Sequence, residues 1–418
     1  MLNYRKVFNI IGHSAQNDYS MFYEEWPARY IIPSTGITLA HSNSIVILPR
    51  IDQIVQLIDF YEFFFGERIN ILWTEDKYFM LDEELYHDTQ LTDELNKISS
   101  YYYDKGFQLV VRPYSYNKYF KLWMQRLPKL NAICESESNT KKYRYKNIFY
   151  RHIRHMGKSN FIDYSNHLLI PKGFICDDTY DLLEAYNCLS SYTENSLLIK
   201  PINGLGGVGF SFVSSISDIY NYKFAYSDSV ILSEFINVDI NPFIKNEVNC
   251  SIEFIEGKIL GPPTTQIIKN FEWIGGISPT IENEEFIKHA LYQSKIILKY
   301  LIKNKILGVG GIDFIGKGNK AYLIDNNLTR ETGSHFPKYF QNKYAKSSAF
   351  CCLELSNSTK SIYEIWDLLT YHKLGFSLNK GTGIFPLVYL PSIASIFISF
   401  DEDGKKAFDK LMDFNTLI

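Results

Sequence analysis

The stretch that decides the fold is Gly308–Pro337, GVGGIDFIGKGNKAYLIDNNLTRETGSHFP. It contains an apolar run that ends near Asp313 and a second that ends at Asp325, with Asn327 two residues later. The Gly-Lys-Gly-Asn segment at 316–319 predicts a turn between these runs. We therefore expect the two runs to pair as an antiparallel hairpin.

Acids at the ends of apolar strands need a reason, because burial penalises a carboxylate unless it is paired or bound to a metal. The hairpin points two carboxylates and one amide oxygen into the same small volume. Hard oxygen ligands of this kind hold Mg²⁺ beside substrate phosphates. The sequence therefore predicts a magnesium site formed by Asp313, Asp325 and Asn327.

A second motif lies about a hundred residues upstream. Leu197–Pro201 is a short apolar strand that carries Lys200, and it leads into the glycine-rich segment NGLGGVG at 203–209. Glycines let backbone N–H groups approach phosphate oxygens, and a lysine adds a charge that reaches them. The candidate phosphate-binding residues here are Lys200, Gly204, Gly206, Gly207 and Gly209.

The glycine motif has other interpretations, which its context separates. It matches G-x-G-x-x-G, but a dinucleotide-binding fold needs a helix after the loop, whereas Phe210–Val213 predicts a strand. The G-K-[ST] ending of a P-loop is missing, and no H-R-D motif of a protein kinase is present. Taken alone, the loop is also compatible with an ordinary glycine-rich hairpin turn.

The combination resembles the ATP-grasp superfamily: a lysine strand, a glycine hairpin, an acid that ends a later strand, and paired strands with metal ligands. The resemblance implies an α/β protein with an ATP-grasp fold, in which two α+β lobes clasp ATP. It further implies that Glu234, Phe235 and Ile236 form the linker that holds adenine, with Asp239 near the ribose. Lys158 and Lys269 match further lysines that face the triphosphate.

The tail after Asp325 narrows the resemblance. It is similar to the E-x-N-x-R-x-x-G-x-T-H-P ending of one branch, which contains pheganomycin-type peptide ligases and the butirosin carrier-protein ligase. Three departures stand out: Asp325 replaces glutamate, Thr329 precedes a shifted Arg330, and Phe336 is inserted before the proline. The segment 381–407 is also similar to this branch and predicts a strand, a small helix, a strand and a further helix.

The resemblance implies an ADP-forming ligase that uses ATP and Mg²⁺ to activate a carboxylate as an acyl phosphate. An amine of an amino acid or peptide would then attack, as in secondary metabolism. Arg330 and His335 are the candidate catalytic residues, although a surface ion pair and a structural histidine explain them equally well. The alternatives are an acyl carrier protein's phosphopantetheine thiol as acceptor, and a non-catalytic ATP-binding protein.

Composition limits the partners. The formal charge of −3 gives no reason to expect nucleic acid or an anionic membrane. The six cysteines show no C-x-x-C spacing, which is typical of free thiols in a reducing compartment such as the cytoplasm. Thr382–Phe400 is uncharged, but its prolines and β-branched residues favour buried strands and a short helix over a membrane span. The family suggests a homodimer.

The chain divides into three predicted domains. Residues 1–140 form an α/β pre-ATP-grasp domain with a parallel sheet, 141–345 the nucleotide-binding domain, and 346–418 a C-terminal module. The polar run at 134–142 is the best candidate for a linker. Apolar spacing predicts helices over Ile51–Phe64 and Glu284–Lys303, and Asp177 or Asp178 caps a helix that ends at Cys188. Strands are predicted at 7–11, 44–48, 69–73 and 108–111.

Overall fold

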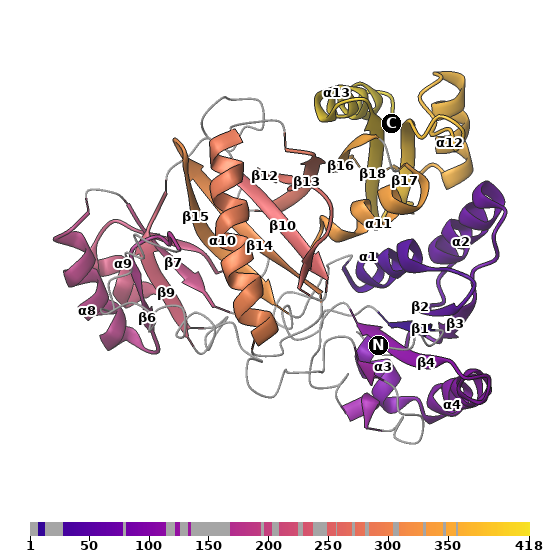
Figure 1. Ribbon diagram of the computed structural model, residues 1–418, viewed down its shortest axis with the longest axis horizontal. Helices are drawn as coiled ribbons and strands as arrows, with labels where there is room; N and C mark the ends of the chain where they lie inside the picture. The colour runs from indigo at the N-terminus through magenta and orange to yellow at the C-terminus, as the bar shows by residue number, and fades with distance from the viewer. Residues whose placement is uncertain are drawn as a thin grey trace.

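The structure is a computed structural model. It describes residues 7–12, 28–77, 81–113, 122–125, 133–134, 168–193, 196–202, 209–224, 229–236, 249–255, 257–269, 272–280, 284–303, 309–328, 332–345, 348–356 and 358–418. These residues form four sheets with helices packed against them (Figure 1).

The N-terminal part is a parallel sheet of order β3-β2-β1-β4-β5. Its strands are β1 (Val7–Gly12), β2 (Ser44–Pro49), β3 (Ile71–Thr74), β4 (Gln108–Pro113) and β5 (Ile133–Cys134). Its helices are α1 (Ala28–Thr35), the 3-10 turn η2 (Gly36–Leu39), α2 (Asp52–Phe65), α3 (Leu81–His87) and α4 (Thr89–Asp104). The predicted strands, the helix over 51–64 and the parallel pairing are confirmed.

The small lobe is an antiparallel sheet of order β6-β9-β7-β8, drawn in magenta in Figure 1. Its strands are β6 (Gly173–Cys176), β7 (Leu197–Pro201), β8 (Ser211–Val213) and β9 (Val230–Glu234), and its helices are α8 (Thr179–Ser190) and α9 (Ile216–Asn221). Asp178 caps α8 by accepting a hydrogen bond from the backbone N–H of Asp181, as predicted. β8 follows the glycine segment as a strand, so the dinucleotide-binding interpretation is excluded.

The central sheet has the order β11-β10-β14-β15. Its strands are β10 (Asn249–Ile255), β11 (Lys258–Ile259), β14 (Val309–Lys317) and β15 (Lys320–Leu328). α10 (Glu284–Lys303) covers one face and buries an apolar cluster that includes Phe286, Ile297 and Phe314. The predicted hairpin and the predicted helix are both confirmed.

The fourth sheet has the order β12-β13-β16-β18-β17. Its strands are β12 (Thr265–Lys269), β13 (Glu272–Ser278), β16 (Ala349–Glu354), β17 (Gly383–Leu390) and β18 (Ala394–Asp401), accompanied by α11 (His335–Tyr344), α12 (Ile362–Tyr371) and α13 (Gly404–Asn415). The sheet therefore crosses the predicted boundary at residue 345. An apolar cluster joins it to α2 through tilted aromatic rings, among them Phe60 and Phe64 of α2 against Phe385 of β17.

The prediction of a small helix between the last two strands is wrong. β17 and β18 pair as an antiparallel hairpin, and only a short turn at 391–393 separates them. Ser392 adopts the left-handed backbone conformation in that turn, at φ 61°. Pro386 lies at a register shift in an edge strand, where a missing N–H is tolerated. The uncharged stretch 382–400 is thus the buried strand pair of a sheet.

Candidate active site

The hairpin β14–β15 places the predicted metal ligands on one face. Ile312 and Phe314 pack toward α10, so the intervening Asp313 projects from the opposite face, since side chains alternate along a strand. Asp325 is the cross-strand partner of Asp313, and Asn327 is the partner of Gly311. The three residues predicted from the sequence are therefore brought together.

Amide side chains hold Asp313 in place. Its Oδ2 accepts a hydrogen bond from Nδ2 of Asn327 at 3.0 Å, and its Oδ1 accepts from Nε2 of Gln266 at 3.1 Å. Gln266 is anchored in turn, because its backbone N–H and C=O bond to the amide of Asn249 at 2.8 and 2.9 Å. Sequence reasoning missed the role of Gln266 and Asn249, and only their polarity on buried strands signalled it.

The donor set fits a magnesium ion shared with phosphates. No group of three His, Cys, Asp or Glu side chains within the described ranges could hold a metal by itself. Mg²⁺ differs, because it keeps several waters and binds one or two carboxylates together with substrate phosphates. Asp313 and Asp325 supply two carboxylates from paired strand positions, and such oxygen donors suit a cation of this kind.

Lys200 connects the small lobe to this hairpin. It lies on β7, and its ammonium donates a hydrogen bond to the backbone oxygen of Ile324, the residue before Asp325. The lysine predicted to bind phosphate therefore lies beside the predicted metal ligands. Gly209 has a φ of +78°, and its carbonyl accepts from the Tyr222 hydroxyl at 3.3 Å. Lys158, Gly204, Gly206 and Gly207 lie outside the described residues.

The predicted adenine linker begins at Glu234, the last residue of β9. The Glu234 carboxylate accepts from the backbone N–H of Lys172 at 2.9 Å, and the backbone N–H of Phe235 donates to Ser196 at 2.7 Å. Ile236 is buried against Ile315 of β14 in a small apolar cluster. The segment thus touches both lobes.

Of the remaining predicted residues, the structure describes Lys269 and His335. Lys269 is exposed at the end of β12, where its Cα is paired with Glu272 at the tip of the β12–β13 hairpin. Asp239 and Arg330 lie outside the described residues.

His335 begins α11 and is completely buried. Its Nδ1 accepts a hydrogen bond from the backbone N–H of Thr332 at 2.9 Å, so the neutral ring carries its proton on Nε2. Burial lowers the pKa of His335 to about 4, against the opposing effect of the nearby Glu253 carboxylate. The ring is therefore neutral at pH 7 and ties the first turn of α11 to the chain that follows β15.

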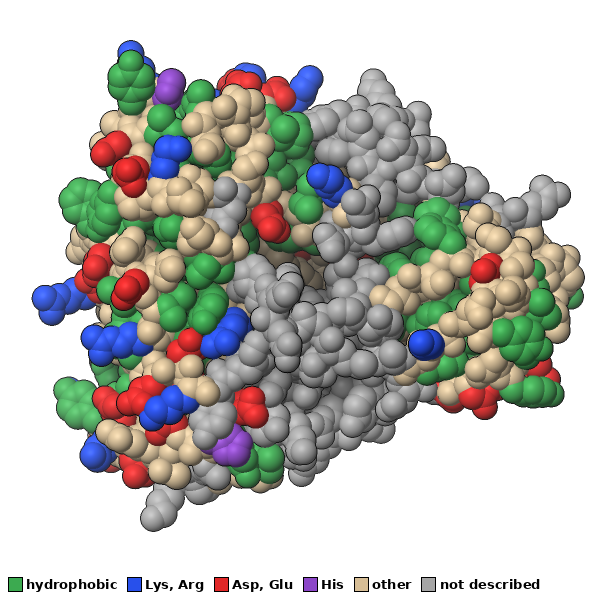
Figure 2. Space-filling model, turned by 180° about the vertical axis from the view of Figure 1, so that it is seen from behind, with side chains coloured by type: hydrophobic (Ala, Val, Ile, Leu, Met, Phe, Trp, Pro, Cys, Tyr) green, Lys and Arg blue, Asp and Glu red, His purple; other side chains and the backbone are tan. Residues whose placement is uncertain are grey.

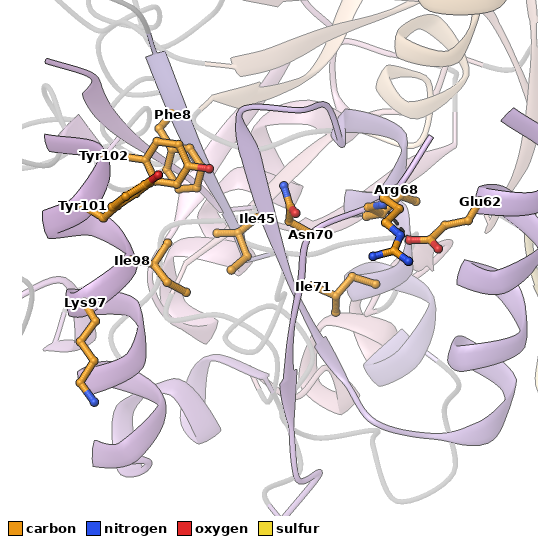
Figure 3. A pocket seen from close by; sticks show the side chains of 11 residues that line it. Phe8, Ile45, Glu62, Arg68, Asn70, Ile71, Lys97, Ile98, Tyr101 and Tyr102 are labelled. Carbon is orange, nitrogen blue, oxygen red and sulfur yellow. Dashed lines mark hydrogen bonds between the residues drawn. The ribbon is translucent and has the colours of Figure 1, made fainter. Parts of the chain in front are cut away.

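The described surface also holds a pocket away from the predicted site. Figure 2 shows acidic and basic side chains interspersed on the described surface of the face in view. A pocket of about 740 Å³ lies near the starts of β1, β2 and β3, between Tyr101 and Tyr102 on one side and Arg68 and Glu62 on the other (Figure 3). It includes none of the predicted site residues.

Comparisons with known proteins show the fold. Neither a protein-family model nor a curated protein matches the chain by sequence. An N5-carboxyaminoimidazole ribonucleotide synthetase in complex with ADP matches with a TM-score of 0.59 at 14% identity, covering 99% of this chain and 98% of that one. Biotin carboxylase from Campylobacter jejuni, in a β,γ-ATP complex, matches with a TM-score of 0.59 at 10% identity over 97% and 90%.

A third similar structure was solved with a magnesium nucleotide. The biotin carboxylase domain of 2-oxoglutarate carboxylase from Hydrogenobacter thermophilus, in complex with MgADP and bicarbonate, has a TM-score of 0.54 at 12% identity over 98% and 90%. The chain therefore has the ATP-grasp fold over nearly its whole length. Among the helices that the structure describes, none combines the length and the apolar character of a membrane span.

Proposed function

We propose that this chain, which has the ATP-grasp fold, is an ATP-dependent, ADP-forming ligase that joins a carboxylate to an amine of an amino acid or peptide. The observation that carries the proposal is the cross-strand pair Asp313–Asp325, with Lys200 of the small lobe bonded one residue away at Ile324. Two acidic side chains and a lysine thus lie together in a fold that two nucleotide complexes share, one with ADP and one with a β,γ-ATP ligand.

The proposed reaction has two steps. A carboxylate oxygen attacks the γ-phosphorus of ATP, the bond to the β-phosphate oxygen breaks, and ADP leaves with the electron pair. The amine nitrogen then attacks the acyl carbon, phosphate leaves, and the nitrogen loses a proton. Activation is needed because an oxide ion is a poor leaving group, whereas phosphate is a good one.

The residues of the chain act by position and charge. Asp313, Asp325 and Asn327 would hold Mg²⁺, which neutralises charge on the transferred phosphoryl oxygens. Lys200 exchanges its bond to the Ile324 carbonyl for the triphosphate, together with Lys158 and the glycine segment. Glu234, Phe235 and Ile236 contact the adenine, with Asp239 at the ribose and Lys269 at the outer phosphates.

We assign different parts to the two candidate catalytic residues. Arg330 binds the reacting carboxylate, because a guanidinium fork suits two carboxylate oxygens. His335 is fully buried and neutral, so it positions the chain around Thr332 and does not transfer a proton. The tail from Asp325 to Pro337 supports an amino acid or peptide as substrate, as in secondary metabolism.

The test is product detection by mass spectrometry. The purified protein is incubated with ATP, Mg²⁺ and pooled amino acids, with parallel reactions that add bicarbonate or a phosphopantetheinylated carrier protein. A new amide mass with an equal amount of ADP is expected. If mass is added only to the carrier protein, the acceptor is a thiol and not an amine. If ADP release depends on bicarbonate, the activated carboxylate is a one-carbon substrate and not an amino acid. Release of AMP would contradict the acyl-phosphate step.

A further inference from the structure

A buried ion pair lies beside the metal-binding face. Lys338 on α11 and Glu253 on β10 have side chains that are 1% and 0% exposed, and the ammonium donates directly to the carboxylate. Removing two charges from water is unfavourable, and apolar residues of similar volume often stabilise a core equally well. The pair therefore needs an explanation other than stability.

Strand register places the pair next to the paired acids. Glu253 is the cross-strand partner of Gly311, which is in turn the partner of Asn327. Two residues further along β14, the next row on the same face holds Asp313 and Asp325. Since alternate residues of a strand share a face, Glu253 projects from the same face as Asp313, one row away.

Lys338 also reaches the connection that leads into β12. Its ammonium donates to the backbone oxygen of Pro262 at 2.6 Å. Two residues later, the hydroxyl of Thr264 lies 3.4 Å from the same carboxylate oxygen of Glu253 that Lys338 contacts. One buried centre therefore ties α11, β10 and the start of β12 together.

The start of β12 determines where Gln266 lies. Thr264 is bridged to Ser251 of β10, and two residues further on Gln266 donates to Asp313 at 3.1 Å. The segment 262–266 thus makes three contacts in turn. Pro262 contacts Lys338, Thr264 contacts Glu253, and Gln266 contacts Asp313. A shift of this segment would move the amide that holds one oxygen of Asp313.

Lys338 is the cation on which Glu253 depends. Burial has the largest single effect and raises the pKa of the Glu253 carboxyl, but the Lys338 ammonium, with further contributions from His335 and Ser251, brings that pKa below its ordinary value. His335 is nearby but neutral at pH 7, because burial lowers its pKa to about 4. Across the described residues, no other ion pair involves Glu253.

We propose that the Glu253–Lys338 pair is a positioning element for the metal site, which holds the start of β12 so that Gln266 orients Asp313. Neither residue touches the metal or the substrate, so both are positioning residues. The inference rests on the proposed function, because it takes Asp313 and Asp325 as ligands of Mg²⁺.

The experiment measures Mn²⁺ binding to the full chain by electron paramagnetic resonance in the presence of ADP. The test variant is Glu253→Gln combined with Lys338→Met, which leaves no unpaired charge in the core. Circular dichroism and melting curves check that it is folded. We expect about a tenfold weaker Mn²⁺ affinity, as for the loss of outer partners of metal ligands. Binding of ADP without metal should stay within about twofold.

Two further variants separate positioning from a general structural effect. Gln266→Ala should weaken Mn²⁺ binding by a similar factor, and combining it with the double variant should add little, because both act through one link. Lys343→Met is the matched control. It removes a lysine from the same helix, where Lys343 pairs with Glu67 at 3.1 Å, and should leave Mn²⁺ affinity unchanged.

Asp325→Asn tells the two possible failures apart. If Asp325→Asn binds Mn²⁺ as tightly as the unaltered protein, the proposed metal site is wrong. If Asp325→Asn loses Mn²⁺ while the Glu253→Gln/Lys338→Met variant binds within about twofold of the unaltered protein, the metal site stands and the positioning role is overturned.

Discussion

Asp313 and Asp325 are cross-strand partners in the antiparallel pair β14–β15, so their carboxyl groups share one face of the sheet. Asp313 is 7% exposed and is held by two amide donors. Carboxylates on paired strands are hard oxygen ligands, which suit a cation that also binds phosphates. The pair is therefore the part of the molecule on which the proposed chemistry depends most.

Asp325→Asn should abolish catalysis while sparing nucleotide binding. The substitution keeps the shape of the side chain but removes the charge that a magnesium ion needs, so ADP formation should fall by about a hundredfold or more. Coupled-enzyme detection of ADP measures the first quantity, and fluorescence titration with a nucleotide analogue measures the second. Asp409→Asn, on the exposed surface of α13, is the control. ADP release at the unaltered rate in Asp325→Asn would remove the metal assignment.

Lys200→Met should weaken the use of ATP. The Lys200 ammonium lies against the carbonyl of Ile324, next to Asp325, and its loss removes a charged hydrogen bond to phosphate. A charged hydrogen bond contributes about 1.5–3 kcal/mol, so kcat/KM for ATP should fall roughly tenfold to a hundredfold. Lys295→Met, on the exposed side of α10, provides the comparison. Equal kcat/KM values in the two variants would exclude Lys200 from the phosphate site.

His335 should make stability depend on pH. Its folded-state pKa of about 4 lies below the ordinary value of 6.5, so the unfolded chain binds a proton that the folded chain refuses. Stability is therefore highest above pH 6.5 and falls by about 3 kcal/mol as the pH drops toward 4. Urea unfolding at several pH values measures the slope.

His335 should contribute the larger part of the slope in the window from pH 6.5 to 4.5, beside His41 and His289, whose pKa values burial also lowers. His335→Gln should reduce the slope clearly, whereas His372→Gln, at an exposed histidine that follows α12, should not. An unchanged slope in His335→Gln would show that another group refuses the proton.

Gly311→Ala should disrupt the site through a steric clash. A methyl group at this position would lie 2.6 Å from Cγ2 of Thr332, in the row between Glu253 and Asn327. Overpacking of this kind costs about 1–3 kcal/mol. Thr332→Ser removes Cγ2 and keeps the hydroxyl, so adding it to Gly311→Ala should restore most of the melting temperature. If the double variant melts no higher than Gly311→Ala alone, the close approach of Thr332 is wrong.

Local patterns predicted much of this architecture. The alternating apolar runs around Asp313 and Asp325 specified the hairpin, and the long apolar stripe of α10 specified its one covered face. The residues after the glycine segment have the apolar spacing of a strand and not of a helix. This spacing excluded a dinucleotide-binding loop, which a helix must follow. The missing helix between β17 and β18 shows the limit, since a short turn and a short helix have similar composition.

The supporting contacts of the site could not be predicted. Gln266 bonds to Asp313 across 47 positions of sequence, and Lys338 bonds to Glu253 across 85. Nothing local marks such partners, because strand order and register decide which polar residues meet. The shared sheet of β12, β13 and β16–β18 was missed for the same reason, and it joins segments that had been assigned to separate domains.

The measurement that tests the central claim most directly is the fate of carboxylate oxygen. The protein is incubated with ATP, Mg²⁺ and a pool of amino acids labelled with ¹⁸O in the carboxylate, and the phosphate released is analysed by mass spectrometry. The account predicts ADP and one ¹⁸O atom in each phosphate, and neither product with Asp325→Asn. Label in AMP, or ADP accompanied by unlabelled phosphate in equal amount, would contradict it.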